Sequence, residues 1–214
     1  MNRVVLNGVM TNIQFSHNIG DVEFDKAEMI VKRETGQEDL INIKFKKFSN
    51  PYQDGQEVSL VGNLRSFNES IDGKDRVNQY VFTYFDSPAD SESEVVNQVE
   101  IDGRICKIGD LTVLKNGKHI IRFILANSIS KGSSKLTSYI HCVGFGVTAK
   151  KIAQYHLTDF VKVTGQFHSR TYKKFIDDSD NFELRIAHEV FVKDIEPAES
   201  TEPVVAETVV ADEV

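Results

Sequence analysis

The chain has 214 residues, of which 40% are hydrophobic and 27% charged, and its formal net charge is −7. This length accommodates one large domain or two small ones, and the composition is ordinary for a soluble globular protein. No run approaches the roughly 18 apolar residues of a membrane-spanning helix, and no signal peptide follows Arg3. We therefore expect a cytoplasmic protein without a membrane partner.

The charge is distributed unevenly along the chain. Residues 1–94 carry 10 Lys and Arg against 16 Asp and Glu, residues 95–195 carry 15 against 10, and residues 196–214 carry none against 6. The net charges of these segments are −6, +5 and −6. An acidic chain thus contains a basic segment, and this segment is compatible with an anionic partner such as nucleic acid.

The first half begins with an alternating apolar segment that returns in the second half. Residues 4–13, VVLNGVMTNI, are matched by residues 99–108, VEIDGRICKI. Residues 58–67, VSLVGNLRSF, are matched by residues 161–170, VKVTGQFHSR. The glycine inside each segment favours a bend or bulge in a strand over a ligand contact. Two similar β domains of roughly 90–100 residues therefore follow each other.

Domain boundaries follow from the repeats and from the segments between them. We predict an acidic first domain over residues 1–86 and a basic second domain over residues 95–195. Residues 87–94 are polar and acidic and contain a proline, which is typical of a linker. Residues 196–214 contain two prolines and no aromatic or basic residue, so we predict a disordered tail.

Alternating residues in the second domain predict five strands. They cover residues 97–106, 119–127, 138–145, 159–170 and 182–193, with a short helix near residues 148–155. A helix between the third and fourth of five strands is typical of the OB fold. In the first domain Asn50 and Pro51 take the place of the helix, which predicts a truncated helix or a turn. The predicted fold is all-β, with two tandem five-stranded OB barrels and a disordered acidic tail.

Motifs for catalysis or metal binding are missing from the sequence. No Walker loop, HExxH motif or nucleophile and base arrangement is found, and the glycines at 144 and 146 are too few for a phosphate-binding loop. Cys106 and Cys142 lack the spacing of metal ligands, so we expect two buried thiols. The sequence thus predicts no catalytic residue, no metal and no cofactor, and an enzyme is the least expected class.

Basic and aromatic residues alternate on two predicted strands of the second domain. On the third strand, Tyr139 and Phe145 lie on a common side. On the fourth strand and just beyond it, one side carries Lys162, Thr164, Gln166, His168, Arg170 and Tyr172. Cations neutralise phosphates and rings stack on bases, so this pattern predicts binding of single-stranded nucleic acid.

Five segments of the second domain, read in order, carry a family resemblance. They are NQVEIDGR at 97–104, FILAN at 123–127, YIHCVGFGVTAK at 139–150, VKVTGQFHSRTY at 161–172 and ELRIAHEV at 183–190. This series resembles the strand motifs of the bacterial single-stranded DNA-binding protein (SSB) family. The first domain begins with a similar segment, NRVVLNG at 2–8, but its later residues match only weakly.

The resemblance implies which residues contact DNA. Aromatic side chains at three places in that family stack on bases, and those places are here Tyr139, Phe145 and Tyr172. The family commonly assembles four OB domains, so two per chain imply a homodimer, with a monomer as the alternative. Candidate phosphate contacts lie around the three rings: Lys131, Lys135, Lys150, Lys151, Lys162, His168, Arg170, Lys173 and Lys174.

The first domain and the tail depart from the family pattern. Glu69 stands seven residues beyond its glycine, where the second domain has Tyr172. We therefore expect the first domain to support assembly or to add a weaker DNA surface. The tail ends ADEV, without the Pro-Phe ending through which family members recruit replication and repair enzymes. The residues that leave the first domain some binding capacity are Lys44, Phe45, Lys46, Lys47 and Phe48.

Together these features predict a non-catalytic protein that coats single-stranded DNA in replication, recombination or repair, without sequence specificity. Two alternatives are a primosomal OB-fold accessory protein and a protein-interaction scaffold. Single-stranded RNA stays open as a ligand, because backbone charge and base stacking are common to both polymers. Recruitment of replication or recombination proteins through the acidic tail also stays open, as does competition of that tail with DNA for the basic surface.

Overall fold

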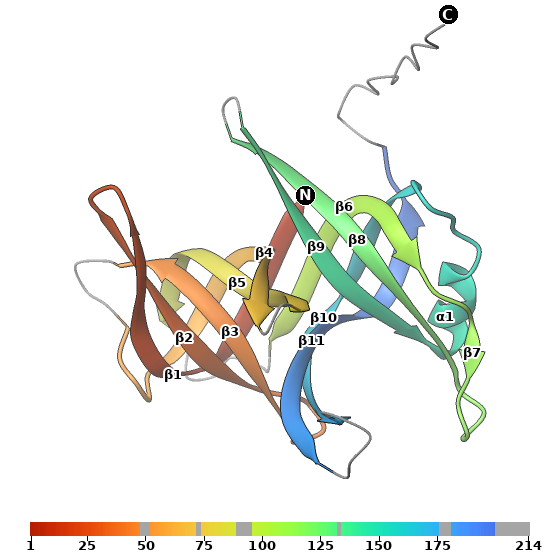
Figure 1. The fold of residues 1–214 in the computed structure, drawn as a ribbon, viewed down its shortest axis with the longest axis horizontal. Helices are drawn as coiled ribbons and strands as arrows, with labels where there is room; N and C mark the ends of the chain where they lie inside the picture. The colour runs from red at the N-terminus through yellow and green to blue at the C-terminus, as the bar shows by residue number, and fades with distance from the viewer. Residues whose placement is uncertain (48–51, 72–73, 89–95, 132–133, 176–180, 200–214) are drawn as a thin grey trace, which may run out of the picture.

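The structure is a computed structural model that describes residues 1–47, 52–71, 74–88, 96–131, 134–175 and 181–199. Within these ranges, side chains are described except at residues 70–71, 74–76, 84–88, 130–131 and 134. Two β-barrels lie side by side (Figure 1). No described residues form a helix long and apolar enough to cross a membrane.

The first barrel is built from β1 (Asn2–Ile19), β2 (Val22–Lys32), β3 (Glu38–Lys46), β4 (Glu57–Ile71) and β5 (Lys74–Pro88). Strand β1 pairs with both β2 and β4, β2 pairs with β3, and β4 pairs with β5, all antiparallel. The parallel pairing of β3 with β5 closes the barrel.

The second barrel repeats this topology with β6 (Asn97–Ile108), β8 (His119–Lys131), β9 (Ser134–Phe145), β10 (Phe160–Phe175) and β11 (Phe182–Pro197). Its parallel closure joins β9 to β11. The short strand β7 (Thr112–Val113) pairs with β8, and the helix α1 (Gly146–Ile152) connects β9 to β10. The predicted pair of five-stranded barrels, with a helix between the third and fourth strands of the second, is confirmed.

Several element ends differ from the predicted ones. Strands β10 and β11 form a long hairpin. Strand β10 continues to Phe175, beyond the predicted end at residue 170, and β11 starts at Phe182. Helix α1 ends at Ile152 instead of residue 155, because Gln154 and Tyr155 donate to carbonyls three residues back and tighten the last turn.

Parts of three predictions lie outside the described residues. These are the turn expected at Asn50 and Pro51, most of the predicted linker and residues 200–214 of the predicted tail. Where the structure describes these segments, it differs from the prediction: residues 87–88 of the predicted linker belong to β5, and residues 196–197 of the predicted tail belong to β11.

Two of the four repeat glycines, Gly62 and Gly165, lie at bulges as predicted. The register of β10 against β11 shifts at Gly165, and the register of β4 against β5 shifts at Gly62. A Cβ atom at Gly165 would lie 2.3 Å from the Phe191 carbonyl oxygen, and one at Gly62 would lie 2.5 Å from the Phe82 carbonyl oxygen. Only glycine allows the neighbouring backbone to approach this closely.

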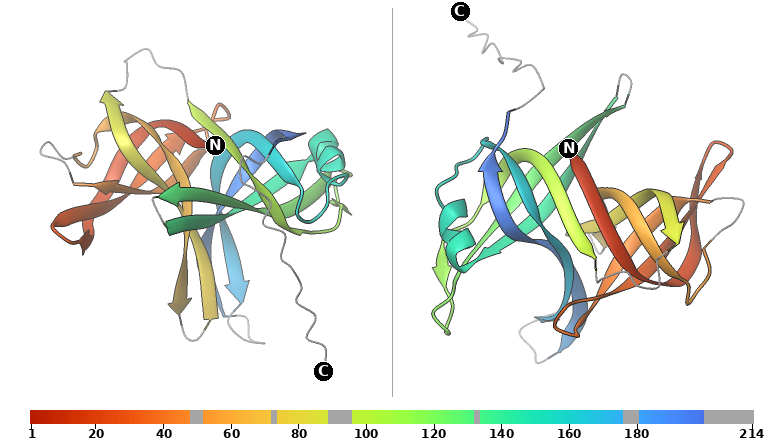
Figure 2. Two further views of the ribbon diagram at one scale, coloured as in Figure 1. Left: turned by 90° about the horizontal axis from the view of Figure 1, so that it is seen from above. Right: turned by 180° about the vertical axis from the view of Figure 1, so that it is seen from behind.

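A local two-fold axis relates the barrels where β1 pairs with β6 (Figure 2, right). Val4 lies opposite Val99, its counterpart in the repeat, while Asn2 faces Ile101 and Leu6 faces Asn97. The pairing joins all eleven strands into one sheet. The two barrels are therefore arranged like the subunits of a symmetric dimer.

Matched asparagines fix the first strand of each barrel to its fourth. Asn2 donates from Nδ2 to the Leu64 carbonyl and accepts from the Leu64 N–H, both at 2.8 Å. Asn97 makes the same two bonds with Phe167, at 2.7 and 2.8 Å. Both asparagines are buried, and these bonds satisfy their amide groups.

A second contact between the domains follows the same symmetry. The Ser66 hydroxyl on β4 accepts from the Tyr139 N–H at 2.8 Å, and the Ser169 hydroxyl on β10 accepts from the Leu40 N–H at 2.9 Å. Leu40 is thus the structural counterpart of Tyr139. The strand pairings agree, since they place Ile43 opposite Val81 and Cys142 opposite Val190. Consequently the counterpart of Phe145 is Lys46.

Candidate nucleic-acid interface

The three predicted stacking residues have different surroundings. Tyr139 lies on β9 with 45% of its surface exposed. Tyr172 lies half-buried on β10, and the Arg170 guanidinium carbon is 5.2 Å from the centre of its ring. Phe145 ends β9 half-buried, with its ring centre 5.4 Å from that of Phe191. Tyr139 offers the most open ring, whereas Phe145 is already packed against another aromatic side chain.

Tyr172 and Arg170 lie in a cleft of about 640 Å³ between the two domains. The second domain supplies these two residues together with Arg185 and His141. The first domain supplies residues 77–79 of β5, so it forms part of the wall. We call this the interdomain cleft; it is lined by Val77, Asn78, Gln79, His141, Arg170, Tyr172, Arg185, Ile186, Ala187, His188 and Glu189.

Gln79 of the first domain forms hydrogen bonds to two strands of the second domain in the cleft. Its side-chain oxygen accepts from the His141 N–H at 3.0 Å, and its amide nitrogen donates to the His188 carbonyl. The Gln79 side chain is 2% exposed, so this link between β5, β9 and β11 is shielded from water. No sequence pattern predicts this link, because its hydrogen bonds join strands that are distant in the chain.

A buried carboxylate of the cleft holds two arginines, Arg170 in the cleft lining and Arg122 outside it. Glu189 accepts from Arg170 Nε at 3.1 Å through one oxygen and from Arg122 Nε at 3.2 Å through the other. The Glu189 side chain is buried, whereas the two arginine side chains are about half exposed. Each guanidinium therefore keeps part of its surface open for an anion while its position is fixed.

The predicted lysines are spread over the surface. Lys173 lies with its ammonium 4.1 Å from the centre of the Phe182 ring, and Lys174 is half-buried on the same strand. Lys135 is exposed on β9, and the side chain of Lys131 lies outside the described residues. Lys162 is within 4.0 Å of Glu100 and 3.8 Å of Glu196. Among the described lysines, Lys173 and Lys174 directly follow the cleft residue Tyr172 on β10.

Helix α1 carries two more predicted lysines, at the end of the second barrel that is remote from the first domain (Figure 1). Lys150 is exposed, and Lys151 binds Asp194 at 2.7 Å. The structure therefore does not bring these lysines together with Tyr172.

His168 does not lie on an open surface, unlike the phosphate contact that the sequence predicted. Its Nδ1 atom is 2.7 Å from Asp39 of the first domain, and its side chain is 8% exposed. The first domain covers β10 at this point. The polar side of the strand therefore faces the first domain here, and His168 contacts that domain instead of solvent.

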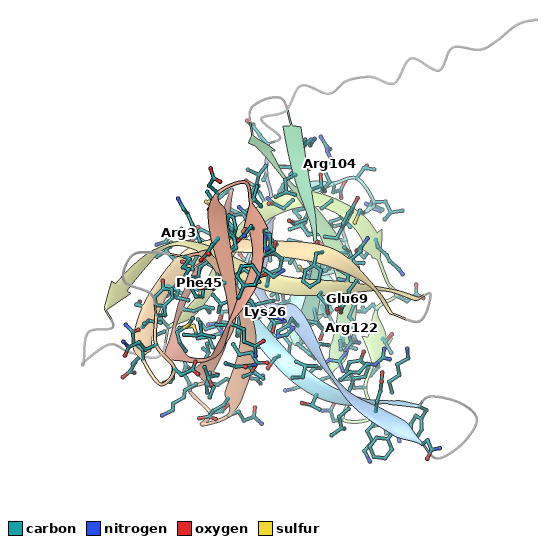
Figure 3. The ribbon with its side chains drawn as sticks, turned by 60° about the vertical axis from the view of Figure 1, so that its left-hand side comes forward. Arg3, Lys26, Phe45, Glu69, Arg104 and Arg122 are labelled. Atoms are coloured by element: carbon teal, nitrogen blue, oxygen red, sulfur yellow. The ribbon has the colours of Figure 1, made fainter. Side chains whose placement is uncertain are left out.

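The first domain also differs from two expectations. Phe45 is fully buried inside the first barrel (Figure 3) and cannot stack on a ligand, and Phe48 lies outside the described residues. Lys47 binds Glu23 at 2.6 Å. Glu69 does occupy the place of Tyr172, because β4 pairs it with Arg76 as β10 pairs Tyr172 with Arg185.

One of the two cysteines is not buried as predicted. Cys142 is buried, and burial raises the pKa of its thiol. Cys106 is exposed, because the pairing of β6 with β8 shifts register between Ile105 and Lys107 and leaves the cysteine between them as the extra residue.

The Single-strand binding protein family model matches residues 96–197. Two crystal structures of the single-stranded DNA binding protein from Thermus aquaticus resemble the whole chain. A deletion mutant is 18% identical with a TM-score of 0.68, and the alignment covers 96% of this chain and 98% of that one. The wild type is 17% identical with a TM-score of 0.68 and covers 95% of both chains. No curated protein matches the sequence.

Proposed function

Because residues 96–197 match the Single-strand binding protein family model, we propose that the chain binds single-stranded DNA and coats it without sequence specificity. The observation that carries this proposal is the interdomain cleft, in which Tyr172 lies beside Arg170, Arg185 and His141. Rings that stack on bases and cations that neutralise phosphates are the two requirements of such binding.

The chemistry of the cleft supports binding without sequence specificity. Stacking depends on the faces of the bases, which all four bases have, and the arginines bind phosphates that are the same at every position. The exposed ring of Tyr139 adds a stacking position outside the cleft. The strand then contacts the protein through its backbone and base faces, with affinity that falls as salt rises.

The wider role follows from this binding. We propose a non-catalytic cytoplasmic protein that protects exposed strands during replication, recombination or repair. Two OB barrels per chain support a homodimer with four barrels. The acidic tail is proposed to compete with DNA for the basic surface and to contact replication or recombination proteins. Single-stranded RNA is a second candidate ligand, since the cleft has the same complementarity to both backbones.

The proposal is tested by titrating the full chain with oligo-dT and oligo-rU and following binding by gel shift and fluorescence anisotropy. Tyr139→Ala and Tyr172→Ala should each weaken binding roughly 5- to 150-fold, the equivalent of about 1–3 kcal/mol for each stacked base. Phe15→Ala is the matched control, because Phe15 is an exposed ring on β1 that lines neither cleft nor domain contact.

Three outcomes separate the candidate functions. Unchanged affinity in the Tyr139→Ala, Tyr172→Ala double variant would reject the proposed surface. Failure of the wild type to bind either polymer at low salt would favour the protein-interaction scaffold. Binding that needs a helicase partner before long strands are coated would favour the primosomal accessory protein.

A further inference from the structure

The first domain contains a cleft of its own, with a volume of about 480 Å³. We call it the first-domain cleft. Its walls come from the β1–β2 hairpin, from β3, β4 and β5, and from the tip of the β8–β9 hairpin of the second domain. The side chains that matter for its chemistry are Phe24, Lys44, Lys46, Arg65, Tyr80 and Phe82.

Aromatic and cationic groups form a row in this cleft. The ring of His17 stacks on Phe24 with centres 5.1 Å apart and planes 10° from parallel. The Phe24 ring centre is 6.1 Å from that of Phe82, and the Arg65 guanidinium carbon is 3.9 Å from the Phe82 centre. Rings held at these distances, with a guanidinium at the end of the row, form a surface on which bases can stack.

Lys44 lies half-buried against two rings, Tyr80 of the cleft lining and Phe67 beside it. Its ammonium is 4.2 Å from the centre of Phe67 and 4.6 Å from that of Tyr80. Glu69 lies nearby, yet no described carboxylate is within salt-bridge distance of Lys44. Burial and the charge of Lys26 lower the pKa of Lys44. A partly desolvated cation of this kind gains stability when an anion such as a phosphate reaches it.

The charge of the cleft is opposite to that of its domain. None of the described residues that line it is acidic, although residues 1–94 carry a net charge of −6. Lys44 and Lys46 on β3 and Arg65 on β4 supply three positive charges from the two strands that flank β5. The described lining of this cleft is therefore cationic and matches a negatively charged ligand, whereas the carboxylates of Glu28 and Glu69 line a neighbouring hollow.

The cleft lies next to the stacking residues of the second domain. Leu136 of β9 lines one end of it, and three residues further on the Tyr139 N–H donates to Ser66, the neighbour of Arg65. On the other side a smaller hollow of about 300 Å³ shares Lys44 and Tyr80 with the first-domain cleft and Asn78 with the interdomain cleft. A strand leaving the interdomain cleft thus has a concave path into the first domain.

This cleft is not a copy of a site in the second domain. The strand pairings give Val143, Phe145 and His168 as the counterparts of Lys44, Lys46 and Arg65. Val143 and His168 are buried, so the second domain has no equivalent row of cations.

We propose that the DNA strand bound at the interdomain cleft continues into the first-domain cleft, where Lys44, Lys46 and Arg65 bind its phosphates and the Phe24, Tyr80 and Phe82 rings contact its bases. This inference rests on the proposed function and extends it to a surface that is specific to the first domain. The acidic domain then takes a direct part in binding, in contrast to the weak or supporting role expected from its charge.

The test compares the full chain with a Lys44→Gln, Lys46→Gln double variant on oligo-dT of about 12 and about 40 nucleotides, lengths that match one OB domain and several. The variant should bind the long oligonucleotide at least tenfold more weakly. The slope of log affinity against log salt should become about 1.4 less steep, which corresponds to two phosphate contacts on a single strand. The matched control is Lys115→Gln with Lys118→Gln, two exposed lysines between β7 and β8.

The short oligonucleotide separates the two clefts. It should bind the Lys44→Gln, Lys46→Gln variant with wild-type affinity, because the interdomain cleft is unchanged, whereas Tyr172→Ala should weaken it. Photocrosslinking of iodouracil-substituted strands should label Tyr80 or His17 only with the long oligonucleotide. Wild-type affinity and salt slope on the long strand, with no crosslink in the first domain, would overturn the inference. If the wild type bound neither length, the proposed function itself would fail.

Discussion

The Asp39 carboxylate of the first domain lies 2.7 Å from the Nδ1 atom of His168 in the second, and both side chains are buried. The same carboxylate accepts from Arg33 Nε at 2.8 Å and from the Ser169 N–H at 2.7 Å. These contacts hold the pKa of Asp39 well below its usual range, against the opposing effect of burial. One buried anion therefore fastens β3 of one barrel to β10 of the other.

Replacing Asp39 should destabilise the whole chain. Asp39→Ala leaves the Arg33 guanidinium and the Ser169 N–H without their shared acceptor in a buried place, and such a loss costs about 3–5 kcal/mol. Urea unfolding followed by circular dichroism measures this free energy. Lys47→Ala is the control, since it breaks an exposed pair with Glu23 and should change the unfolding free energy little. Equal effects of both variants would contradict the structural role of Asp39.

Stability should depend on pH in two separate ranges. Burial lowers the pKa of His188 below its ordinary value of 6.5, despite its bond to the Leu40 carbonyl. As the pH falls below about 6.5, the unfolded chain takes up this proton first, so the free energy of unfolding decreases. Asp39 has a lowered pKa, so its contribution persists until the pH falls below about 4 and is lost only in that more acidic range.

Urea midpoints measured between about pH 8 and pH 3 should show both ranges. His188→Gln should flatten the decrease between about pH 7 and pH 5 and leave the acidic decrease in place. A steep decrease near neutral pH in this variant would mean that other groups control that range. His141 is the first to examine, since burial also lowers its pKa.

Gly165→Ala should destabilise the second barrel. The added Cβ would lie 2.3 Å from the Phe191 carbonyl oxygen, so the bulge between β10 and β11 would have to open, at a cost of about 1–3 kcal/mol. Gly109→Ala is the comparison, because its Cβ would lie 3.3 Å from the Arg122 carbonyl oxygen, a much milder contact. Thermal unfolding should show a clearly larger decrease for Gly165→Ala, and similar decreases would argue against the close contact.

Two pairs of adjacent lysines should differ in their effect on DNA binding. Lys173 and Lys174 follow Tyr172 on β10, whereas Lys150 and Lys151 lie on α1, away from the first domain. Changing the first pair to glutamine should make the salt dependence of binding about 1.4 less steep, and changing the second pair should leave it unaltered. Equal slopes for the two double variants would show that the strand does not follow β10 beyond the cleft.

Much of the fold could be predicted because it depends on local alternation. Each strand shows its inward face as apolar residues at every second position, as in β6, where Val99, Ile101 and Ile105 are buried. Two of the repeat glycines, Gly62 and Gly165, marked bulges correctly, whereas the register shifts of β1 and β6 lie beyond Gly8 and Gly103. The ends of β10 and helix α1 were less accurate, because they depend on hairpin length and on hydrogen bonds in the last turn.

The site could be predicted only as far as the pattern within one strand reaches. Tyr139 and Tyr172 stay predicted stacking residues, which the alternating pattern of their strands indicates. The positions of Gln79 and His168 could not, because each contacts residues of the other domain. The first-domain cleft was missed for another reason: its cations come from β3 and β4 of a domain whose summed charge is negative, and summed charge does not describe one concave surface.

The pairing of β1 with β6 has a further consequence, because both strands belong to one polypeptide. Two separate single-domain chains joined in this way would come apart on dilution, whereas here the partner strand is always present at a high effective concentration. A symmetric dimer must also use every surface residue twice, once on each subunit. Covalent linkage removes that requirement, so Lys46 could arise at the position of Phe145 without changing both barrels at once.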